Sequence, residues 1–138
     1  MKLVIDANVL FAALIKHGNT RILVLFPEFD LYCPEFIIQE FKKHIESLSI
    51  KSGLAPQELE ALLEEIINTA EIKIIKANEF INEETIKKIH FIDSDDLEYI
   101  SLATELNCPL WSNDKELKKQ SIIKIITTKE LIEQVLRK

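Results

Sequence analysis

The sequence predicts an α/β domain with a mostly parallel sheet and helices on both of its faces. Short apolar segments rich in Ile, Leu and Val alternate along the chain with longer segments of helical periodicity. The first segment, residues 2–5, is apolar on both faces, as expected of a central strand in a parallel sheet. The chain has 138 residues, 47% of them hydrophobic, so we expect a single domain over residues 1–138.

The expected strands are short apolar runs bounded by Pro, Gly or polar residues. They are residues 2–5, 29–33, 72–75, 109–111 and 122–126. A strand that leads into a helix brings its carboxyl end to the edge of the sheet where ligands bind in α/β proteins. Asp6 follows the first strand directly and is therefore the first candidate for chemistry.

The expected helices are segments in which apolar residues recur at three- and four-residue spacing. They are residues 7–16, 21–26, 34–49, 56–70, 79–90, 93–107, one or two turns over 114–119, and a closing helix after Thr127. We expect Gly18 to end the first helix and Pro34 to lie in the first turn of the third. Thr127 and Glu130 have the spacing of a capping box.

Charge and motif content exclude several classes of function. The net charge of −6 argues against broad electrostatic capture of nucleic acid, although a metal could neutralise a local acidic centre. Glycine occurs only at positions 18 and 53, so neither a G-x-G-x-x-G motif nor a P-loop is possible. These nucleotide-binding classes are therefore ruled out.

The chain shows no signs of secretion or membrane insertion. No apolar run reaches the roughly 20 residues of a membrane span, and the amino terminus enters a strand at once. Cys33 and Cys108 lie in or beside apolar stretches without metal-binding spacing, and we expect them to be buried free thiols. We therefore expect a cytoplasmic protein with no membrane partner.

Glu40 is an acid in a position where an apolar side chain is expected. It follows Ile37 by three residues and Phe36 by four, so it lies along the apolar stripe of its helix. A carboxylate there is costly to bury unless it is paired or binds a metal. The alternative is an acid at the edge of the stripe, paired with a neighbouring Lys43 or His44 or exposed to solvent.

Three other acids have ordinary structural explanations when taken singly. Asp96 shares a helix face with Ile100 and Ala103, but an acid in a first turn also complements the helix dipole. Asp6 and Asp114 each follow a strand and could each cap a helix.

Taken together, these acids predict a metal site. In a parallel sheet, Asp6, Glu40, Asp96 and Asp114 can all converge on the edge formed by the carboxyl ends of the strands. Converging carboxylates repel one another unless cations offset their charge, and oxygen ligands suit Mg²⁺ or Mn²⁺. Such ions activate water for attack on phosphorus. The residues therefore indicate metal-dependent phosphodiester hydrolysis.

The same residues give the chain a resemblance to the PIN domain family. The matching pieces lie in order over nearly the whole chain. They are Ile5-Asp6-Ala7-Asn8-Val9-Leu10, Pro34 with Ile38-Gln39-Glu40, Asp93-Ser94-Asp95-Asp96-Leu97-Glu98-Tyr99-Ile100-Ser101-Leu102-Ala103, and Trp111-Ser112-Asn113-Asp114-Lys115-Glu116-Leu117. Each motif is short, and the match depends on all of them being in register.

This resemblance implies a three-layer α/β/α domain with a five-stranded sheet and an Mg²⁺- or Mn²⁺-dependent ribonuclease activity. Many members look like the VapC-type toxins of type II toxin–antitoxin pairs. The implied partners are therefore an RNA substrate, a cognate antitoxin and a second copy of the chain in a homodimer.

The resemblance also implies roles for individual residues. Asp6, Glu40, Asp96 and Asp114 are carried over as the catalytic, metal-binding acids. In that site Glu40 would complete a second ion position or orient the attacking water. Asn8 and Ser112 match frequent polar positions beside this site. Together with Lys115, which is a candidate phosphate contact on its own account, they are the substrate-binding candidates. Ala7 stands where the family often has Thr, which removes one hydroxyl contact, and the histidines at positions 17, 44 and 90 are expected at the surface or in packing.

Two other functions remain open at this point. One is a catalytically inactive PIN-fold module that binds RNA or protein. The other is a phosphatase-like hydrolase with Asp6 as nucleophile, which is disfavoured because position 8 is Asn and not a second acid.

Overall fold

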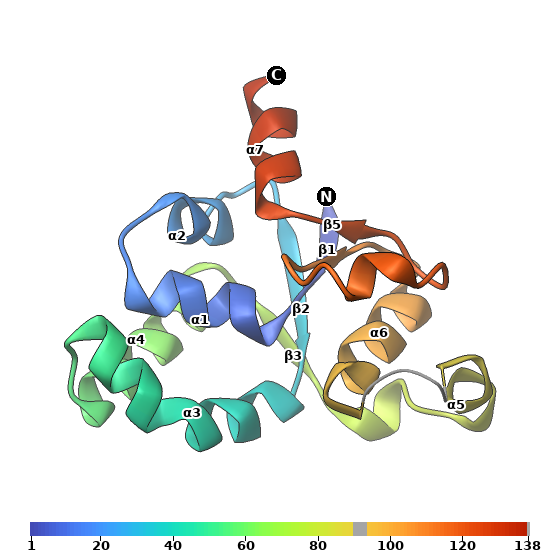
Figure 1. Ribbon diagram of the computed structural model, residues 1–138, viewed down its shortest axis with the longest axis horizontal. Coiled ribbons are helices and arrows are strands. Elements are labelled where there is room, and N and C mark those ends of the chain that lie inside the picture. The colour runs from blue at the N-terminus through green and yellow to red at the C-terminus, as the bar shows by residue number, and fades with distance from the viewer. Residues whose placement is uncertain (90–93, 138) are drawn as a thin grey trace.

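The computed structural model describes residues 1–89 and 94–137, and its centre is a five-stranded parallel sheet in the order β3-β2-β1-β4-β5 (Figure 1). The strands are β1 (Lys2–Ile5), β2 (Asp30–Pro34), β3 (Lys73–Ile75), β4 (Leu110–Trp111) and β5 (Ile125–Ile126). As predicted, β1 is central, and Leu3, Val4 and Ile5 are fully buried. The chain fills one side of β1 first and then the other, so β1 lies at the topological switch point.

Helices cover both faces of this sheet. They are α1 (Ala7–Ile15), α2 (Asn19–Val24), α3 (Phe36–Ser52), α4 (Pro56–Thr69), α5 (Glu83–Ile89), α6 (Ser94–Leu106) and α7 (Thr128–Leu136), with the 3-10 turns η1 (Ala77–Glu79) and η2 (Leu117–Lys119). Figure 1 shows α1 to α4 on one side of the central strands and α5 and α6 on the other. The predicted three-layer α/β/α architecture is thus confirmed. None of the helices in these described ranges has both the length and the apolar character of a membrane span.

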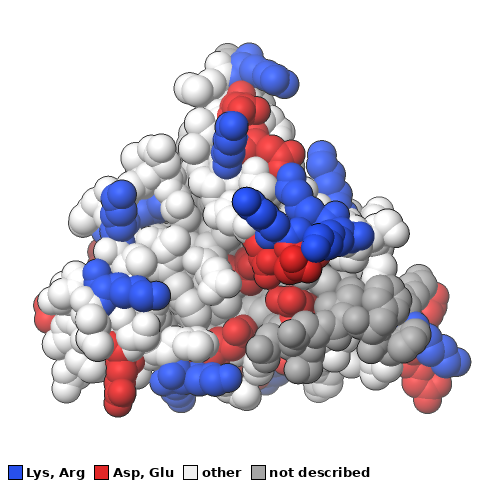
Figure 2. Space-filling view, in the orientation of Figure 1, with Lys and Arg blue, Asp and Glu red and all other residues white. Residues whose placement is uncertain are grey.

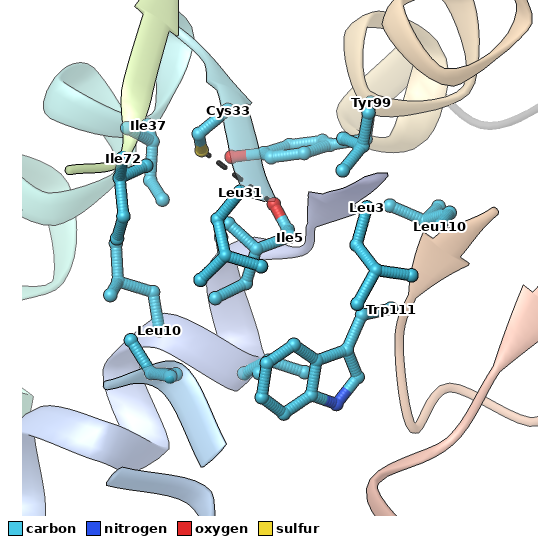
Figure 3. Close-up of a cluster of buried hydrophobic side chains, with 14 of the residues drawn as sticks. Leu3, Ile5, Leu10, Leu31, Cys33, Ile37, Ile72, Tyr99, Leu110 and Trp111 are labelled. Carbon is cyan, nitrogen blue, oxygen red and sulfur yellow. Dashed lines mark hydrogen bonds between the residues drawn. The ribbon is translucent and has the colours of Figure 1, made fainter. Parts of the chain in front are cut away.

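The core joins the central strands to helices on both sides (Figure 3). Trp111 of β4 is fully buried, and its indole Nε1 donates a 3.0 Å hydrogen bond to Thr128 Oγ1. Cys33 is a buried free thiol that donates to the carbonyl of Ile5 at 3.6 Å, as drawn in Figure 3. Cys108 is also free, but it is only half-buried, so the prediction of a buried thiol is wrong there.

Gly18 does not end the first helix as predicted. α1 ends at Ile15, and Gly18 is an extended residue (φ −147°) that precedes α2. The Arg21 guanidinium donates to the carbonyls of Ala13 at 2.6 Å and Leu14 at 3.0 Å. Because a side chain satisfies these helix-end carbonyls, a left-handed glycine is not needed. The left-handed glycine is Gly53 (φ 74°), which closes α3.

Pro34 also differs from its prediction, because it ends β2 and does not begin α3. Pro34 is paired with Ile75 of β3, and the next amide, that of Glu35, donates to the Ile75 carbonyl at 2.8 Å. The strand pairing therefore continues past the proline, and the helix starts only at Phe36.

The helix predicted over residues 79–90 is interrupted. The segment forms η1, then a turn at the buried Phe80, and α5 begins only at Glu83. Burial of Phe80 in the core fixes the chain direction between the two pieces. The predicted ends of this helix and the next, residues 90 and 93, lie outside the described residues.

The last strand is shorter than predicted, with only Ile125 and Ile126 paired to β4. Before Ile125, the backbone groups of Ile122 and Ile123 form hydrogen bonds with the Gln120 side chain and not with a neighbouring strand. Its Oε1 accepts from the amides of Ile122 at 2.9 Å and Ile123 at 3.1 Å, and its Nε2 donates to the Ile123 carbonyl at 2.9 Å.

Candidate active site

Asp6 is held at the carboxyl edge of the sheet by two backbone hydrogen bonds. Its amide donates to the Trp111 carbonyl at 3.0 Å, which extends the pairing of β1 with β4. Its carbonyl accepts from the Leu10 amide at 3.1 Å, the first hydrogen bond of α1. Asp6 is therefore the last residue of the strand pairing and the first of the helix, and its side chain is only 6% exposed.

Ser112 connects Asp6 to Asp114. The Ser112 hydroxyl, which is fully buried, donates to Asp6 Oδ2 at 2.7 Å and accepts from the Asp114 amide at 3.1 Å. Asp114 Oδ1 in turn accepts from the Glu116 amide at 2.9 Å, so this acid also fixes its own loop. Asp114 lies near Asp6, but it does not cap η2 (Leu117–Lys119), because Glu116 occupies the N-cap position and the Asp114 bond closes the turn before it.

The loop that carries Asp114 is tied to α7. Asn113 Nδ2 donates to Thr128 Oγ1 at 2.9 Å, and the Thr128 amide donates to Asn113 Oδ1 at 2.9 Å. The same Thr128 oxygen accepts the hydrogen bond from Trp111. The residues on either side of Ser112 are thus anchored to one threonine.

Glu40 and Asp96 come to this edge from α3 and α6. Glu40 lies one turn into α3 and is half-buried, and its Oε1 accepts a hydrogen bond from the Tyr99 hydroxyl of α6. Asp96 lies in the first turn of α6, three residues before Tyr99. Sequence reasoning missed Tyr99 as a site residue, although the three-residue spacing from Asp96 on one helix was the available indication.

One cavity of about 270 Å³ brings the predicted acids together. It is lined by Asp6, Ala7, Asn8, Glu40, His44, Asp96 and Asp114. Figure 2 shows acidic side chains gathered near the centre of the molecular face, below a group of basic side chains over η2 and α7. Lys115 is exposed and is not among the residues that line the cavity.

His44 is predicted to lie at the surface or in packing, and in the structure it also lines the acidic cavity. It is exposed, and its ring packs edge-on against Phe11 with centroids 6.2 Å apart. Its spacing of four residues from Glu40 on α3 puts both side chains on one helix face.

Burial and mutual repulsion set the electrostatics of this site. Burial is the main cause that raises the pKa of Asp6, and the charge of Asp114 adds to it. The Ser112 hydrogen bond and the amides of Ala7 and Asn8 act in the opposite direction. Burial, followed by the charges of Asp6 and Glu40, also raises the pKa of the Cys33 thiol well above its usual value. The site therefore concentrates negative charge in a partly desolvated space.

The donor chemistry of the cavity fits a divalent cation of the Mg²⁺ or Mn²⁺ type. Its wall offers four carboxylates and the Asn8 amide, and hard oxygen donors are the ligands these ions prefer. Within the described ranges, no three acidic, His or Cys side chains stand close enough together to hold a metal ion as they are arranged here. The Ser112 hydroxyl links the Asp6 carboxylate to the backbone amide of Asp114, so it fixes the Asp114 backbone relative to Asp6.

Comparison with known proteins assigns the chain to a family. Residues 4–136 match the family model of the PIN domain, so the chain belongs to the PIN domain family, as the sequence motifs predicted. No curated protein matches the sequence.

Solved structures share the fold over almost the whole chain. One is the crystal structure of VapBC2 from Rickettsia felis bound to a DNA fragment from their promoter, with a TM-score of 0.68 and 16% identity, covering 92% of this chain and 98% of that one. PAE2754 from Pyrobaculum aerophilum has a TM-score of 0.69 and 14% identity, with coverages of 100% and 91%. VapBC-1 from nontypeable Haemophilus influenzae has a TM-score of 0.64 and 14% identity, with coverages of 94% and 99%. At these identities the likeness is one of fold.

Proposed function

We propose that the protein is an Mg²⁺- or Mn²⁺-dependent endoribonuclease that hydrolyses RNA phosphodiester bonds. The observation that carries this proposal is the meeting of Asp6, Glu40, Asp96 and Asp114 around one cavity at the carboxyl edge of the sheet. Two of these acids follow strands and two lie near the starts of helices. Membership of the PIN domain family, whose members are generally nucleases, supports the same reaction.

The residues of this site have distinct roles in the proposed reaction. Asp6, Asp96 and Asp114 would hold the divalent ion, and Glu40 would complete a second ion position or orient the attacking water. A bound ion of this kind supplies activation of water and stabilisation of the charge that develops on the phosphate oxygens.

The protein also supplies groups that act without the ion. Ser112 holds the Asp6 carboxylate through its hydroxyl, so that the other oxygen of Asp6 has a fixed direction. Asn8 is exposed at the cavity wall, where its amide can donate to a substrate phosphate. Lys115, exposed one residue beyond Asp114, can contact the RNA backbone.

The biological role we propose is that of the toxin in a type II toxin–antitoxin pair. Two of the similar structures bear the names VapBC2 and VapBC-1, which supports a VapC-type protein with a cognate antitoxin. A homodimer and a cytoplasmic location are part of the same proposal.

The substitution Asp6→Asn tests the reaction. We expect it to reduce Mn²⁺-dependent RNA cleavage by at least about a hundredfold, because it removes a metal-binding charge while Asn can still accept from Ser112. The matched control is Asp30→Asn at the amino end of β2, where the carboxylate is paired with Lys73. The rate of cleavage by this control should match that of the unsubstituted protein. EDTA should abolish this cleavage, and added Mn²⁺ should restore it.

Two results would contradict the proposal. Undiminished cleavage by Asp6→Asn in a clean preparation would show that Asp6 is not part of the site. Binding of RNA or protein by the unsubstituted chain with no cleavage in Mg²⁺ or Mn²⁺ would instead indicate an inactive PIN-fold module.

A further inference from the structure

Tyr99 joins the helix that carries Asp96 to the helix that carries Glu40. It belongs to α6, it is 1% exposed, and its hydroxyl donates to Glu40 Oε1 of α3. Its ring packs edge-on against Phe36, the first residue of α3, with centroids 6.5 Å apart and planes at 61°. Figure 3 shows the ring extending from α6 toward Cys33 of β2. Ring and hydroxyl thus contact α3 at two successive turns.

The chemistry of this contact differs from ordinary core packing. Burial first, and then the neighbouring Cys33 and Glu40, raise the pKa of Tyr99, so the hydroxyl remains a hydrogen bond donor. A buried donor aimed at a carboxylate restricts a side chain that otherwise has many rotamers. If Tyr99 only filled space, phenylalanine would serve equally well at this position.

We propose that Tyr99 is a positioning residue of the acidic site, whose hydroxyl holds the Glu40 carboxylate in the orientation required for binding a divalent cation. The inference rests on the metal site of the proposed function. It assigns Tyr99 no contact with the ion or the RNA. Restriction of Glu40 before the ion arrives removes part of the ordering cost of binding. The three-residue spacing from Asp96 also couples the position of Glu40 to the first turn of α6.

The substitution Tyr99→Phe tests this inference, because it removes one oxygen atom and keeps the ring. We expect the affinity of the EDTA-stripped full chain for Mn²⁺, measured by calorimetry, to fall by about tenfold. The Mn²⁺ concentration for half-maximal cleavage should rise by the same factor, while the rate at saturating Mn²⁺ changes less. Circular dichroism and the thermal midpoint check that the fold is retained.

Tyr32→Phe is a matched control. The Tyr32 hydroxyl also donates to a carboxylate, Asp30 Oδ2 at 3.2 Å, but at the amino end of β2. The same atom is therefore removed from the same kind of hydrogen bond outside the cavity. We expect the affinity for Mn²⁺ to stay within twofold of the unsubstituted protein.

A double-mutant cycle with Glu40→Gln shows whether Tyr99 acts through Glu40. In the Glu40→Gln background, Tyr99→Phe should change the affinity for Mn²⁺ by less than about twofold. A tenfold loss of Mn²⁺ affinity on Tyr99→Phe in both backgrounds would overturn the inference that Tyr99 acts through Glu40.

The remaining outcomes separate this inference from the proposed function. A folded Tyr99→Phe variant with unchanged Mn²⁺ affinity would overturn the role of Tyr99 alone. Absence of Mn²⁺ binding by the unsubstituted protein would overturn the metal site and the inference together. A third outcome is that the unsubstituted protein binds Mn²⁺, Tyr99→Phe weakens this binding, and neither protein cleaves RNA. It would support the inference and overturn the proposed nuclease activity.

A second measurement serves if Tyr99→Phe does not fold. The chain has two tyrosines, so 3-fluorotyrosine labelling gives two ¹⁹F resonances that Tyr32→Phe assigns. Mg²⁺ should shift the Tyr99 resonance and leave that of Tyr32 unchanged. A Tyr99 resonance that does not respond to Mg²⁺ bound at the site would overturn the inference.

Discussion

Asp6 is a carboxylate whose surroundings favour its protonated form. Burial raises its pKa above the value of about 3.8 that it has in an unfolded chain. The stability that this group contributes is therefore fully present below the unfolded pKa and is lost as pH rises through the folded pKa. At pH values above the folded pKa, the metal-free protein carries an ionised, buried acid that weakens its fold.

The stability of Asp6→Asn should reveal this cost. In EDTA at pH 7, we expect the variant to be more stable than the unsubstituted protein by on the order of 1 kcal/mol, since a neutral side chain replaces a buried charge. The difference should shrink when the pH is lowered from 7 to 4, because a carboxyl with a raised pKa takes up its proton in the folded state before it does so in the unfolded state. Urea unfolding at both pH values measures it.

Asp30→Asn is the control with the opposite sign. Hydrogen bonding to Lys73 lowers the pKa of Asp30, so at pH 7 its ionised form supports the fold. No gain in stability is expected from this variant. A destabilised Asp6→Asn at pH 7 would contradict the account of Asp6.

Sequence reasoning at this scale finds residues that break a pattern and misses those that obey it. Each of the four acids follows a strand or interrupts an apolar face, and this distinguishes it in the sequence. Tyr99 is an aromatic residue on a buried face, which is ordinary in a core. Only the arrangement of α3 and α6 shows that its hydroxyl meets Glu40.

The capping box at the start of α7 stabilises this helix through hydrogen bonds between Thr127 and Glu130. Thr127 Oγ1 accepts from the Glu130 amide at 3.1 Å, and Glu130 Oε1 accepts from the Thr127 amide at 3.1 Å and from Lys118 at 2.7 Å. The bond from Lys118, followed by those from Thr127, lowers the pKa of Glu130 to about 2. Its contribution to stability is present above the unfolded pKa of 4.5 and is lost as pH falls toward 2.

Glu130→Gln should therefore lower stability at pH 7 and have no effect in strong acid. The expected loss is about 0.5 kcal/mol, because the Glu130 side chain is 43% exposed and solvent screens its charge. Thermal unfolding at several pH values between 7 and 2 measures the difference in stability between the variant and the unsubstituted protein. The control is Glu133→Gln, an exposed acid on the same helix. Equal effects of the two substitutions at pH 7 would show that the cap contributes nothing specific.

Periodicity predicts that elements exist, and hydrogen bonds from residues outside an element decide where it ends. The apolar runs and stripes were sufficient to find every strand of the sheet. The errors at Gly18, Pro34 and the start of the last strand arise from hydrogen-bond partners that periodicity does not encode. These partners are Arg21, Ile75 and Gln120. Such partners satisfy backbone groups that a local reading assigns to the element itself.

The molecule as a whole carries a net charge of −6, yet one group of basic side chains lies beside the acidic side chains at the centre of the face in Figure 2. Lys118 and Lys119 of η2 are paired with Glu130 and Glu116. Lys115 is exposed, and the described ion pairs do not include it. We therefore expect a short stretch of RNA to be held near the cavity, with few backbone contacts.

Lys115→Ala should reduce the salt dependence of RNA binding. With Asp6→Asn present to prevent cleavage, we expect weaker binding and a slope of log K against log salt that is smaller by about 0.7, since one phosphate contact is lost. Fluorescence anisotropy across a salt series measures both quantities. Lys124→Ala, an exposed lysine just before β5, is the control. An equal change in both slopes would show that Lys115 makes no particular contact.

At this scale the resemblance to a family contributed more than the residue pattern did. Alternating strands and helices predict a parallel sheet but not which strands are neighbours. The order β3-β2-β1-β4-β5 is what places Asp6 and Ser112 side by side although 106 positions separate them. That one domain spans residues 1–138 stays a prediction.

Thr128 couples the opening of the first turn of α7 to the rigidity of the acidic site. Its hydroxyl oxygen accepts from both Trp111 and Asn113, on either side of the serine that bonds Asp6. If the first turn of α7 frays, the donors on either side of Ser112 lose their acceptor in the same event. The free energy that opens this turn is thus also part of the free energy that loosens the site, although no atom of α7 lines the cavity.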